Sequence, residues 1–416
     1  MDDGQQEAAA DVPAGRRTAL LSGVVVLDLT RFLAGPFGSM ILADMGATVV
    51  KVEQLVGDST RHQPPYYFEG DSAYFLAINR NKQSIALDIR SDGGRKVLER
   101  LIAGSDIMLD NLRAPQREAL QLSYEHVQKI NPRIISCSLT GFGSDGPYAD
   151  RPAYDIIVEA LGGVMSVTGP EGGPSVRAGV PIGDITAGLY AAIGVLGGLA
   201  YRQRTGRGQH IDVSMLDSQV SLLSYLAQYY FIGGLVAEHQ GRAHVSIPTY
   251  NTFATKNGEE IVIAANTQEM WSALCGVLGR PDLPQDPRFS TNRERLAHRD
   301  ELLEILRAEA GARDRDELYE ALVASQVPAA PINSIDTALA SPQVRHRDMV
   351  VEVTHRSGRK FRTLGTPIKT DDPEGTDFAS PPALGGDSAA IMADLGYSSQ
   401  EIADLAASGA VRLDPA

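Results

Sequence analysis

The sequence predicts an α/β protein, in which helices cover both faces of a parallel sheet and a smaller α+β domain accompanies the sheet. Two observations support this prediction. Short β-branched segments alternate with helical patterns throughout the first half of the chain, as they do in βαβ units. After Gly233 the pattern changes, and 416 residues are more than a single hydrophobic core usually holds.

The first half alternates strand and helix patterns. Strands are expected at residues 23–29, 48–53, 82–89, 106–111 and 133–143, and helices at 35–46, 91–105 and 115–130. Ligands of parallel sheets bind at the carboxyl ends of the strands. These ends carry Thr30, Arg31, Glu53, Asn111 and the loop TGFGSDGP.

The second half opens with a long apolar helix after Asp184. A strand at 210–215 and a helix reaching Phe231 follow, and residues 247–271 resemble a hairpin that precedes charged amphipathic helices. The uncharged runs 185–201 and 218–237 approach the length of a membrane span. Their Gly, Ser and Gln residues favour buried core helices.

Composition argues against several classes of function. Thirty-eight Lys and Arg against 52 Asp and Glu give a net charge of −14, which disfavours binding to nucleic acid or to an anionic membrane. The two cysteines lie far apart and the eight histidines are scattered, so neither a disulfide framework nor a metal site is expected. Residues 1–18 are expected to be a flexible tail without a signal peptide, and a reducing cytoplasm is the expected location.

Asp184 heads the apolar segment ITAGLYAAIGVLGGLAY and has two interpretations. It can cap the following helix by accepting amide hydrogen bonds. It can also act as a carboxylate nucleophile, exposed by the preceding turn while the apolar run keeps water away. Local pattern alone favours the cap.

Three further clusters offer ligand-binding groups. Gly35 and Pro36 open a helix whose first amides suit an anion, Arg80 and Lys82 suit a ribose phosphate, and the glycine-rich loop from Gly141 lets its backbone approach a ligand. Each cluster has a structural alternative, namely βαβ packing, a solvated charged loop and a simple turn. No phosphate-loop, zincin, α/β-hydrolase or dinucleotide motif occurs.

Seven segments of the chain keep the order and spacing of a known family. They are VVVLDLTRFLAGPFGSMILADMGATVVKVE, GDSTR, NRNKQSIALDI, SLTGFGSDGPYADRPAYD, PIGDITAGLYAAIGVLGGLAYRQRTGRGQHIDVSMLDSQ, WSALCGVLG and DPRFSTNRERLAHRDEL. Together they resemble the class III CoA-transferases, also called CaiB/BaiF. The segments VTGPEGGPSVRAGVPIGDITAGLY and DSQVSLLSYLAQYYFIGG are most similar to succinyl-CoA:glutarate and related dicarboxylate CoA-transferases.

The resemblance implies an architecture and an assembly. Residues 19–232 and the C-terminal segment 328–416 would form a Rossmann-like large domain, with the small domain inserted at 233–327. The family resemblance also implies an obligate homodimer of interlocked chains.

The resemblance further implies a covalent mechanism that uses Asp184. The matching aspartate attacks the donor thioester to give a mixed anhydride, and the CoA thiolate then forms an aspartyl thioester that passes CoA to an acceptor carboxylate. Coenzyme A takes part as a substrate thioester, and no metal, ATP or nucleotide cofactor is expected. Backbone amides for each oxyanion and exclusion of water are the physical requirements.

Positions for CoA follow from the same resemblance. The matching CoA positions are Ala34, Leu87, Asn111 and Phe142, and Arg90 is expected at the 3′-phosphate. The chain departs from the oxalate-type members at Leu33, Gln54, Leu112, Ala119 and Thr140. Other basic residues are therefore expected to bind the phosphates, with Arg80, Lys82 and Arg113 as the candidates.

An acyl-CoA donor such as succinyl-CoA and a short dicarboxylate acceptor are the expected substrates. The candidate substrate contacts are Arg31, Gly141, Tyr154 and Arg177; for the two arginines the alternative is a salt bridge at the surface or dimer interface. Tyr154 stands where the related α-methylacyl-CoA racemases carry a His, and a phenol is a weak base near neutrality. An epimerase of that type and a noncatalytic CoA-binding protein are the alternative functions.

Overall fold

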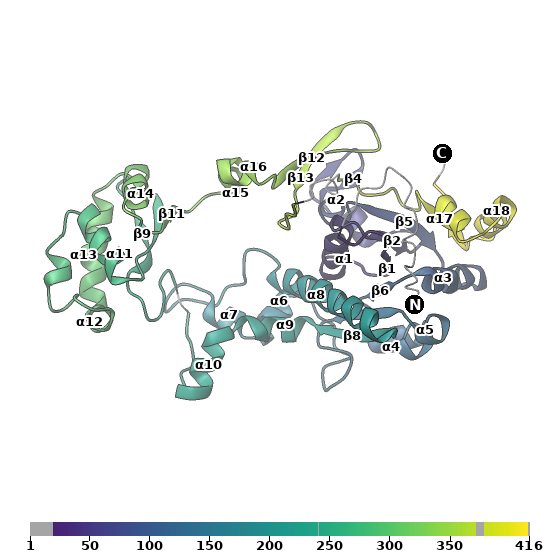
Figure 1. Ribbon diagram of the computed structural model, residues 1–416, viewed down its shortest axis with the longest axis horizontal. Helices are drawn as coiled ribbons and strands as arrows, with labels where there is room; N and C mark the ends of the chain where they lie inside the picture. Colours follow the sequence, from purple (N-terminus) through teal and green to yellow (C-terminus); the bar gives the residue numbers. More distant parts are fainter. Residues whose placement is uncertain (1–19, 240, 372–377, 415–416) are drawn as a thin grey trace, which may run out of the picture. The chain divides into compact units, whose positions relative to one another are not determined.

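The computed structural model describes residues 20–239, 241–371 and 378–414 (Figure 1). The chain divides into two compact units. Unit 1 contains the described residues up to 162, residues 180–222 and those from 348 onward, and unit 2 contains residues 163–179 and 223–347. The expected tail at 1–18 lies outside the described residues.

A seven-stranded sheet forms the centre of unit 1. In spatial order its strands are β14 (Val411–Arg412), β5 (Lys82–Leu87), β2 (Thr48–Glu53), β1 (Val25–Asp28), β6 (Ile107–Asp110), β7 (Ile135–Thr140) and β8 (Gln209–Ser214). All neighbours are parallel except β14, which is antiparallel to β5. The predicted α/β class with a mostly parallel sheet is therefore confirmed.

Helices cover both faces of this sheet. The helices of unit 1 are α1 (Ala34–Asp44), α2 (Ala73–Ile78), α3 (Asp92–Gly104), α4 (Ala114–Ala119), α5 (Tyr124–Ile130), α6 (Asp155–Leu161), α8 (Ile182–Thr205), α9 (Met215–Leu222), α17 (Ser388–Asp394) and α18 (Ser399–Ala407). One buried apolar cluster joins the sheet to α3, α5, α17 and α18, and a second joins it to α1, α6, α8 and α9. A small hairpin, β3 (Tyr67–Phe68) and β4 (Asp71–Ser72), and a second hairpin, β12 (Val350–Thr354) and β13 (Lys360–Leu364), complete the unit.

Unit 2 has its own core around a three-stranded antiparallel sheet. Its strands are β9 (Tyr250–Ala254), β10 (Glu260–Ala264) and β11 (Ala329–Pro331). Its helices are α7 (Val164–Val167), α10 (Ser224–Gly233), α11 (Gln268–Val277), α12 (Asn292–Ala297), α13 (Arg299–Gly311), α14 (Arg315–Ala324), α15 (Ile335–Ala340) and α16 (Pro342–His346). The buried cluster centres on Trp271, Phe289 and leucines of α11, α13 and α14.

Two long helices expected from the sequence are broken. The pattern at 115–130 forms α4 and α5, because Gln121 takes a φ of 52° and Ser123 begins a new helix. The helix expected to reach Phe231 ends at Leu222, and Ser224, with a φ of 44°, starts α10. The longer segment of unit 2 begins at this second break and covers 223–347, whereas the small domain was expected at 233–327; unit 2 also includes residues 163–179, which were expected in the large domain.

Helix α8 is buried on one face only. Within the described residues it is the helix long and apolar enough to cross a membrane, but a core helix of a soluble protein passes the same test. Its small residues Ala187, Ala191 and Val195 pack into unit 1, whereas Tyr190 and Ile193 on another face are exposed. The expectation of a buried core helix therefore holds for one face of α8 and not for the face that carries Tyr190 and Ile193.

Candidate functional site

Asp184 lies in the first turn of α8 and does not cap that helix. The N-cap position is Pro181, which provides no side-chain hydrogen bond. The amides of Gly183 and Asp184 donate instead to Oδ1 of Asp155, at 2.8 and 3.2 Å. The capping interpretation of Asp184 is wrong, because a carboxylate from the first residue of α6 already occupies the end of the helix.

The surroundings of Asp184 favour its protonated form. Burial, and then the negative charge of Asp155, raise the pKa of Asp184 from 3.8 to about 7. Burial also raises the pKa of the Tyr74 phenol to about 12, with Asp184 among the charges that contribute. This coupling indicates that Tyr74 of α2 lies near the two carboxylates. A carboxylate of raised pKa is the more basic nucleophile once it is ionised.

Helices α1 and α8 cross closely, one turn after Asp184 (Figure 1). A Cβ on Gly188 would lie 2.5 Å from the carbonyl oxygen of Ala34, and a Cβ on Gly38 would lie 2.8 Å from that of Gly188. Only glycine permits this approach at either position. The crossing brings the buried residue Ala34, at the start of α1, to the first turns of α8.

The loop after β7 is shaped by a second close approach. A Cβ on Gly141 would lie 2.2 Å from the Cβ of Ala153. The segment that leads into α6 therefore lies against the loop at a position where only glycine fits. Phe142 packs against the same apolar core as α8, and its ring meets Tyr148 edge-on with centroids 5.7 Å apart. Tyr154, directly before Asp155, is 68% exposed.

A pocket of about 340 Å³ opens at the carboxyl ends of β1, β2, β5 and β6. It brings together three sequence-predicted residues, Arg31, Leu87 and Arg90. Positions at which the chain departs from the oxalate-type members also line it, namely Gln54, Leu112 and Ala119. The start of α1 follows β1 at this same edge of the sheet, so the pocket and Asp184 share the edge at which parallel sheets bind ligands.

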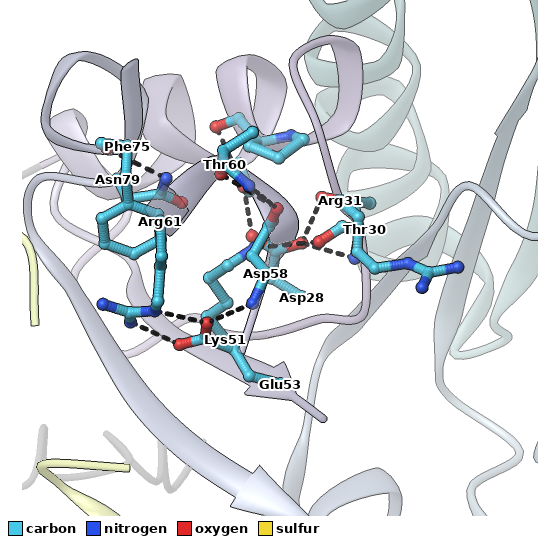
Figure 2. Close-up of polar contacts among 12 residues, drawn as sticks. Asp28, Thr30, Arg31, Lys51, Glu53, Asp58, Thr60, Arg61, Phe75 and Asn79 are labelled. Carbon is cyan, nitrogen blue, oxygen red and sulfur yellow. Dashed lines mark hydrogen bonds and ion pairs between the residues drawn. The ribbon is translucent and has the colours of Figure 1, made fainter. Parts of the chain in front are cut away.

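The side chain of Asn111 fixes the backbone of Arg31. Its Oδ1 accepts the Arg31 amide at 3.1 Å, and its Nδ2 donates to the Arg31 carbonyl at 2.8 Å. The Arg31 guanidinium points away from the neighbouring buried polar groups (Figure 2) and has no hydrogen-bond or ion-pair partner in the part of the chain that the structure describes. Asn111, expected to contact CoA, thus positions an arginine of the pocket.

Buried ion pairs connect residues at the carboxyl end of β2 with the segment that follows β2 (Figure 2). Glu53 accepts two hydrogen bonds from Arg61, at 2.8 and 2.6 Å, and the Nζ of Lys51 lies 3.0 Å from Oδ2 of Asp58. Burial alone would raise the pKa of Asp28, but Lys82 and Lys51 lower it to about 2. Removing one partner of a buried ion pair strongly lowers the stability of the folded state, so this network is a structural part of the fold.

Arg80 and Lys82, expected at the CoA phosphates, are both buried and already paired with other residues of the chain. The Nζ of Lys82 donates to Asp28, to the Pro36 carbonyl and to Asn79 at 2.9–3.1 Å, which uses all three of its protons. Burial lowers the pKa of Lys82 to about 8. Arg80 binds the carboxylate of Asp44 through Nε and Nη2. A role for either residue at a phosphate does not agree with this geometry.

Two further predicted arginines are not among the residues that line the pocket. Arg113 is exposed and donates from Nη1 to the Asp150 carbonyl at 3.3 Å, and it is not part of the pocket lining. Arg177 is exposed and belongs to unit 2, whereas Asp184 belongs to unit 1.

Sequence reasoning missed the roles of Asp155 and Tyr74. Asp155 is 29 residues from Asp184, and Tyr74 lies in a short helix for which no element was predicted. No local periodicity connects such positions. The described residues contain no group of three or more His, Cys, Asp or Glu side chains placed to hold a metal ion.

Comparison with known proteins gives a consistent result. The family model described as CoA-transferase family III matches residues 21–388. The human succinyl-CoA:glutarate CoA-transferase is 38% identical over 94% of this chain and 90% of its own length, and the succinate–glutarate CoA-transferase of Agrobacterium fabrum is 36% identical over 92% and 97%. The crystal structure of a CAIB/BAIF family protein from Brucella suis matches 91% of this chain and all of that chain, at 36% identity and a TM-score of 0.81. The resemblance inferred from the sequence is confirmed, and the chain is a member of CoA-transferase family III.

Proposed function

We propose that this enzyme transfers CoA from an acyl-CoA donor, with succinyl-CoA as the first choice, to a short dicarboxylate acceptor, and that Asp184 is its nucleophile. The observation that carries the proposal is the state of the Asp184 carboxyl group. It lies at the carboxyl edge of the sheet with a pKa of about 7, and its own helix end is capped by another residue. The names of the human and Agrobacterium relatives support the substrate class.

The proposed chemistry needs only carboxylates and a thiolate. A carboxylate oxygen of Asp184 attacks the donor carbonyl, the C–S bond breaks, and CoA leaves as the thiolate. The thiolate attacks the aspartyl carbonyl of the anhydride and releases the donor acid, which leaves an aspartyl thioester. The acceptor carboxylate repeats these two steps in reverse order, so that no bond energy is lost to water.

The pocket of 340 Å³ is the proposed site for the nucleotide end of CoA. Leu87, Val52 and Ile89 supply an apolar wall, and Arg31 and Arg90 supply positive charge. Arg31 has no carboxylate partner among the described residues, so a phosphate does not have to displace one. This arrangement replaces the basic side chains that the oxalate-type members carry at Gln54 and Ala119.

We also propose a homodimer. Tyr190 and Ile193 of α8 are 43% and 62% exposed, and Phe231 and Ile232 of α10 are 74% and 80% exposed. Exposed apolar side chains in such numbers are typical of protein interfaces. The proposed second copy would cover them.

Mass spectrometry tests the mechanism directly. The enzyme is incubated with succinyl-CoA and then with hydroxylamine, which converts an aspartyl anhydride or thioester to a hydroxamate. We expect the modified peptide to contain Asp184 and to be absent from Asp184→Asn. Asp217→Asn, which changes an acid in the first turn of α9, is the matched control and should keep the label.

Two results would contradict the proposal. One is CoA transfer to glutarate that survives in Asp184→Asn. The other is exchange of the α-hydrogen of a 2-methylacyl-CoA in D₂O without CoA transfer, which would indicate an epimerase.

A further inference from the structure

Phe32, in the loop between β1 and α1, combines a left-handed backbone with an exposed aromatic ring. Its φ is 66°, a region that bulky residues rarely occupy because of steric conflict with their own backbone. Its side chain is 49% exposed and belongs to none of the buried apolar clusters that the described residues form. Strained residues of this kind persist where the surrounding structure enforces them, and they collect at binding and catalytic sites.

Polar side chains from two neighbouring strands fix the chain directly before Phe32. The Nζ of Lys51, in β2, donates to the Thr30 carbonyl at 2.9 Å. Asn111, directly after β6, holds both the amide and the carbonyl of Arg31, at 3.1 and 2.8 Å. These contacts prevent the loop from relaxing into an unstrained turn, so the surrounding structure enforces the conformation of Phe32.

Along the chain, Phe32 stands between the pocket and the nucleophile. Arg31, the residue before it, lines the pocket of 340 Å³. Ala34, two residues after it, lies against Gly188, which is one helical turn beyond Asp184. Three Cα–Cα steps of about 3.8 Å separate Arg31 from Ala34, so the loop spans at most about 11 Å between them. This short loop therefore joins the pocket to the neighbourhood of the nucleophile.

A substrate that reaches both places has to pass this loop. With the nucleotide end of an acyl-CoA in the pocket and its thioester carbonyl at Asp184, the pantetheine arm runs between them. The arm consists of two amides, short hydrocarbon stretches and a carbon that bears two methyl groups. Contact with an aromatic ring removes these apolar groups and the exposed half of the ring from water, which favours binding.

We infer that Phe32 is a specificity-determining residue for the proposed reaction, and that its ring packs against the pantetheine arm of the acyl-CoA. This role rests on the proposed function, because it takes the nucleotide end of CoA to occupy the pocket. The ring adds a contact to the arm alone, which neither the pocket nor Asp184 supplies. Such a contact accounts for an aromatic side chain at a position whose backbone favours glycine.

Calorimetric titration with two ligands separates the arm from the nucleotide end. Coenzyme A contains both parts, whereas adenosine 3′,5′-bisphosphate represents the nucleotide end without the arm. Phe32→Ala should bind coenzyme A about tenfold more weakly than the wild type does, because the apolar contact with the arm is lost, and it should bind adenosine 3′,5′-bisphosphate equally well. Phe32→Leu keeps an apolar side chain and should retain more affinity for coenzyme A than Phe32→Ala.

The variant Phe32→Gly separates the ring from the backbone strain. Glycine adopts a φ of 66° without strain, so Phe32→Gly should unfold at a higher denaturant concentration than Phe32→Ala, yet it should bind coenzyme A no more tightly. Gln326→Gly, at a residue of unit 2 with a φ of 58°, is the matched control for relief of strain. It should also unfold at a higher denaturant concentration than the wild type, and it should bind coenzyme A as the wild type does.

Three results would overturn the role of Phe32. One is equal affinity of the wild type and Phe32→Ala for coenzyme A, whether or not the variant forms a weaker dimer. Another is an equal loss of affinity for both ligands, which would make Phe32 a support of the pocket. The third is recovery of wild-type affinity in Phe32→Gly, which would trace the effect to the backbone. A wild-type protein that binds neither ligand would overturn the proposed function together with this role, whereas the three results above leave CoA transfer by Asp184 intact.

Discussion

Replacement of Asp155 by Asn should move the acid limb of the activity profile to lower pH. The asparagine carbonyl can still accept the amides of Gly183 and Asp184, so the end of α8 keeps its cap. The negative charge near Asp184 is lost. Burial is the larger cause of the rise in the Asp184 pKa from 3.8 to about 7, so removal of the charge should reverse less than half of it. The pKa in Asp155→Asn should therefore fall below 7 but not below about 5.5.

The pH dependence of kcat/KM for CoA transfer measures this change. At pH 6 a nucleophile of pKa 7 is about one-tenth ionised, and one of pKa 5.5 is about three-quarters ionised. The ratio of kcat/KM at pH 6 to that at pH 8 should thus rise from about 0.1 in the wild type to as much as about 0.75 in Asp155→Asn. Activity at pH 8 should fall, because a less basic carboxylate is a weaker nucleophile. An acid limb that stays in place, or moves to higher pH, would refute the proposed coupling between the two carboxylates.

Three further predictions concern stability and binding. Asp184→Asn should melt at a higher temperature than the wild type at pH 8 but not at pH 4. Because the pKa of Asp184 is raised in the folded state, the folded protein loses stability as the pH rises from about 4 through 7. Thermal scans at both pH values check this. Gly188→Ala should lower the free energy of unfolding by about 1–3 kcal/mol, because its Cβ would lie 2.5 Å from the Ala34 carbonyl oxygen. Denaturant titration measures this change. The control is Gly197→Ala on the same helix, where a Cβ would meet nothing within 4 Å. Arg31→Ala should raise the KM for acyl-CoA about tenfold with little change in kcat, whereas Arg113→Ala, outside the pocket, should leave steady-state kinetics unchanged.

Much of the fold of unit 1 could be predicted because short segments of the sequence determine its strands and helices. The expected strand at 48–53 matches β2 residue for residue, and the expected helix at 91–105 differs from α3 by one residue at each end. Alternation of β-branched runs with capped helical patterns fixes such elements within a few residues. The family resemblance and the choice of Asp184 as the central carboxylate rested on longer segments in conserved order and spacing.

The environment of the charged groups could not be predicted in this way. Lys82 stands in the polar segment NRNK, which has the composition of a solvated loop, yet it is buried against Asp28, 54 residues away. The cap of α8 comes from Asp155, 29 residues from the amide of Asp184. Both outcomes depend on which residues the sheet brings together, and a single sequence without its topology does not contain that information.

Strand β14 delays the completion of the sheet during synthesis. It covers the outer edge of β5 through Val411 and Arg412, which follow β5 by more than 300 residues along the chain. The hydrogen-bonding edge of β5 therefore stays open during synthesis of everything from residue 88 to residue 410, and bare strand edges pair readily with other chains. A chain truncated before Val411 would contain Asp184 and the whole parallel part of the sheet, yet it would expose the edge along which such chains aggregate.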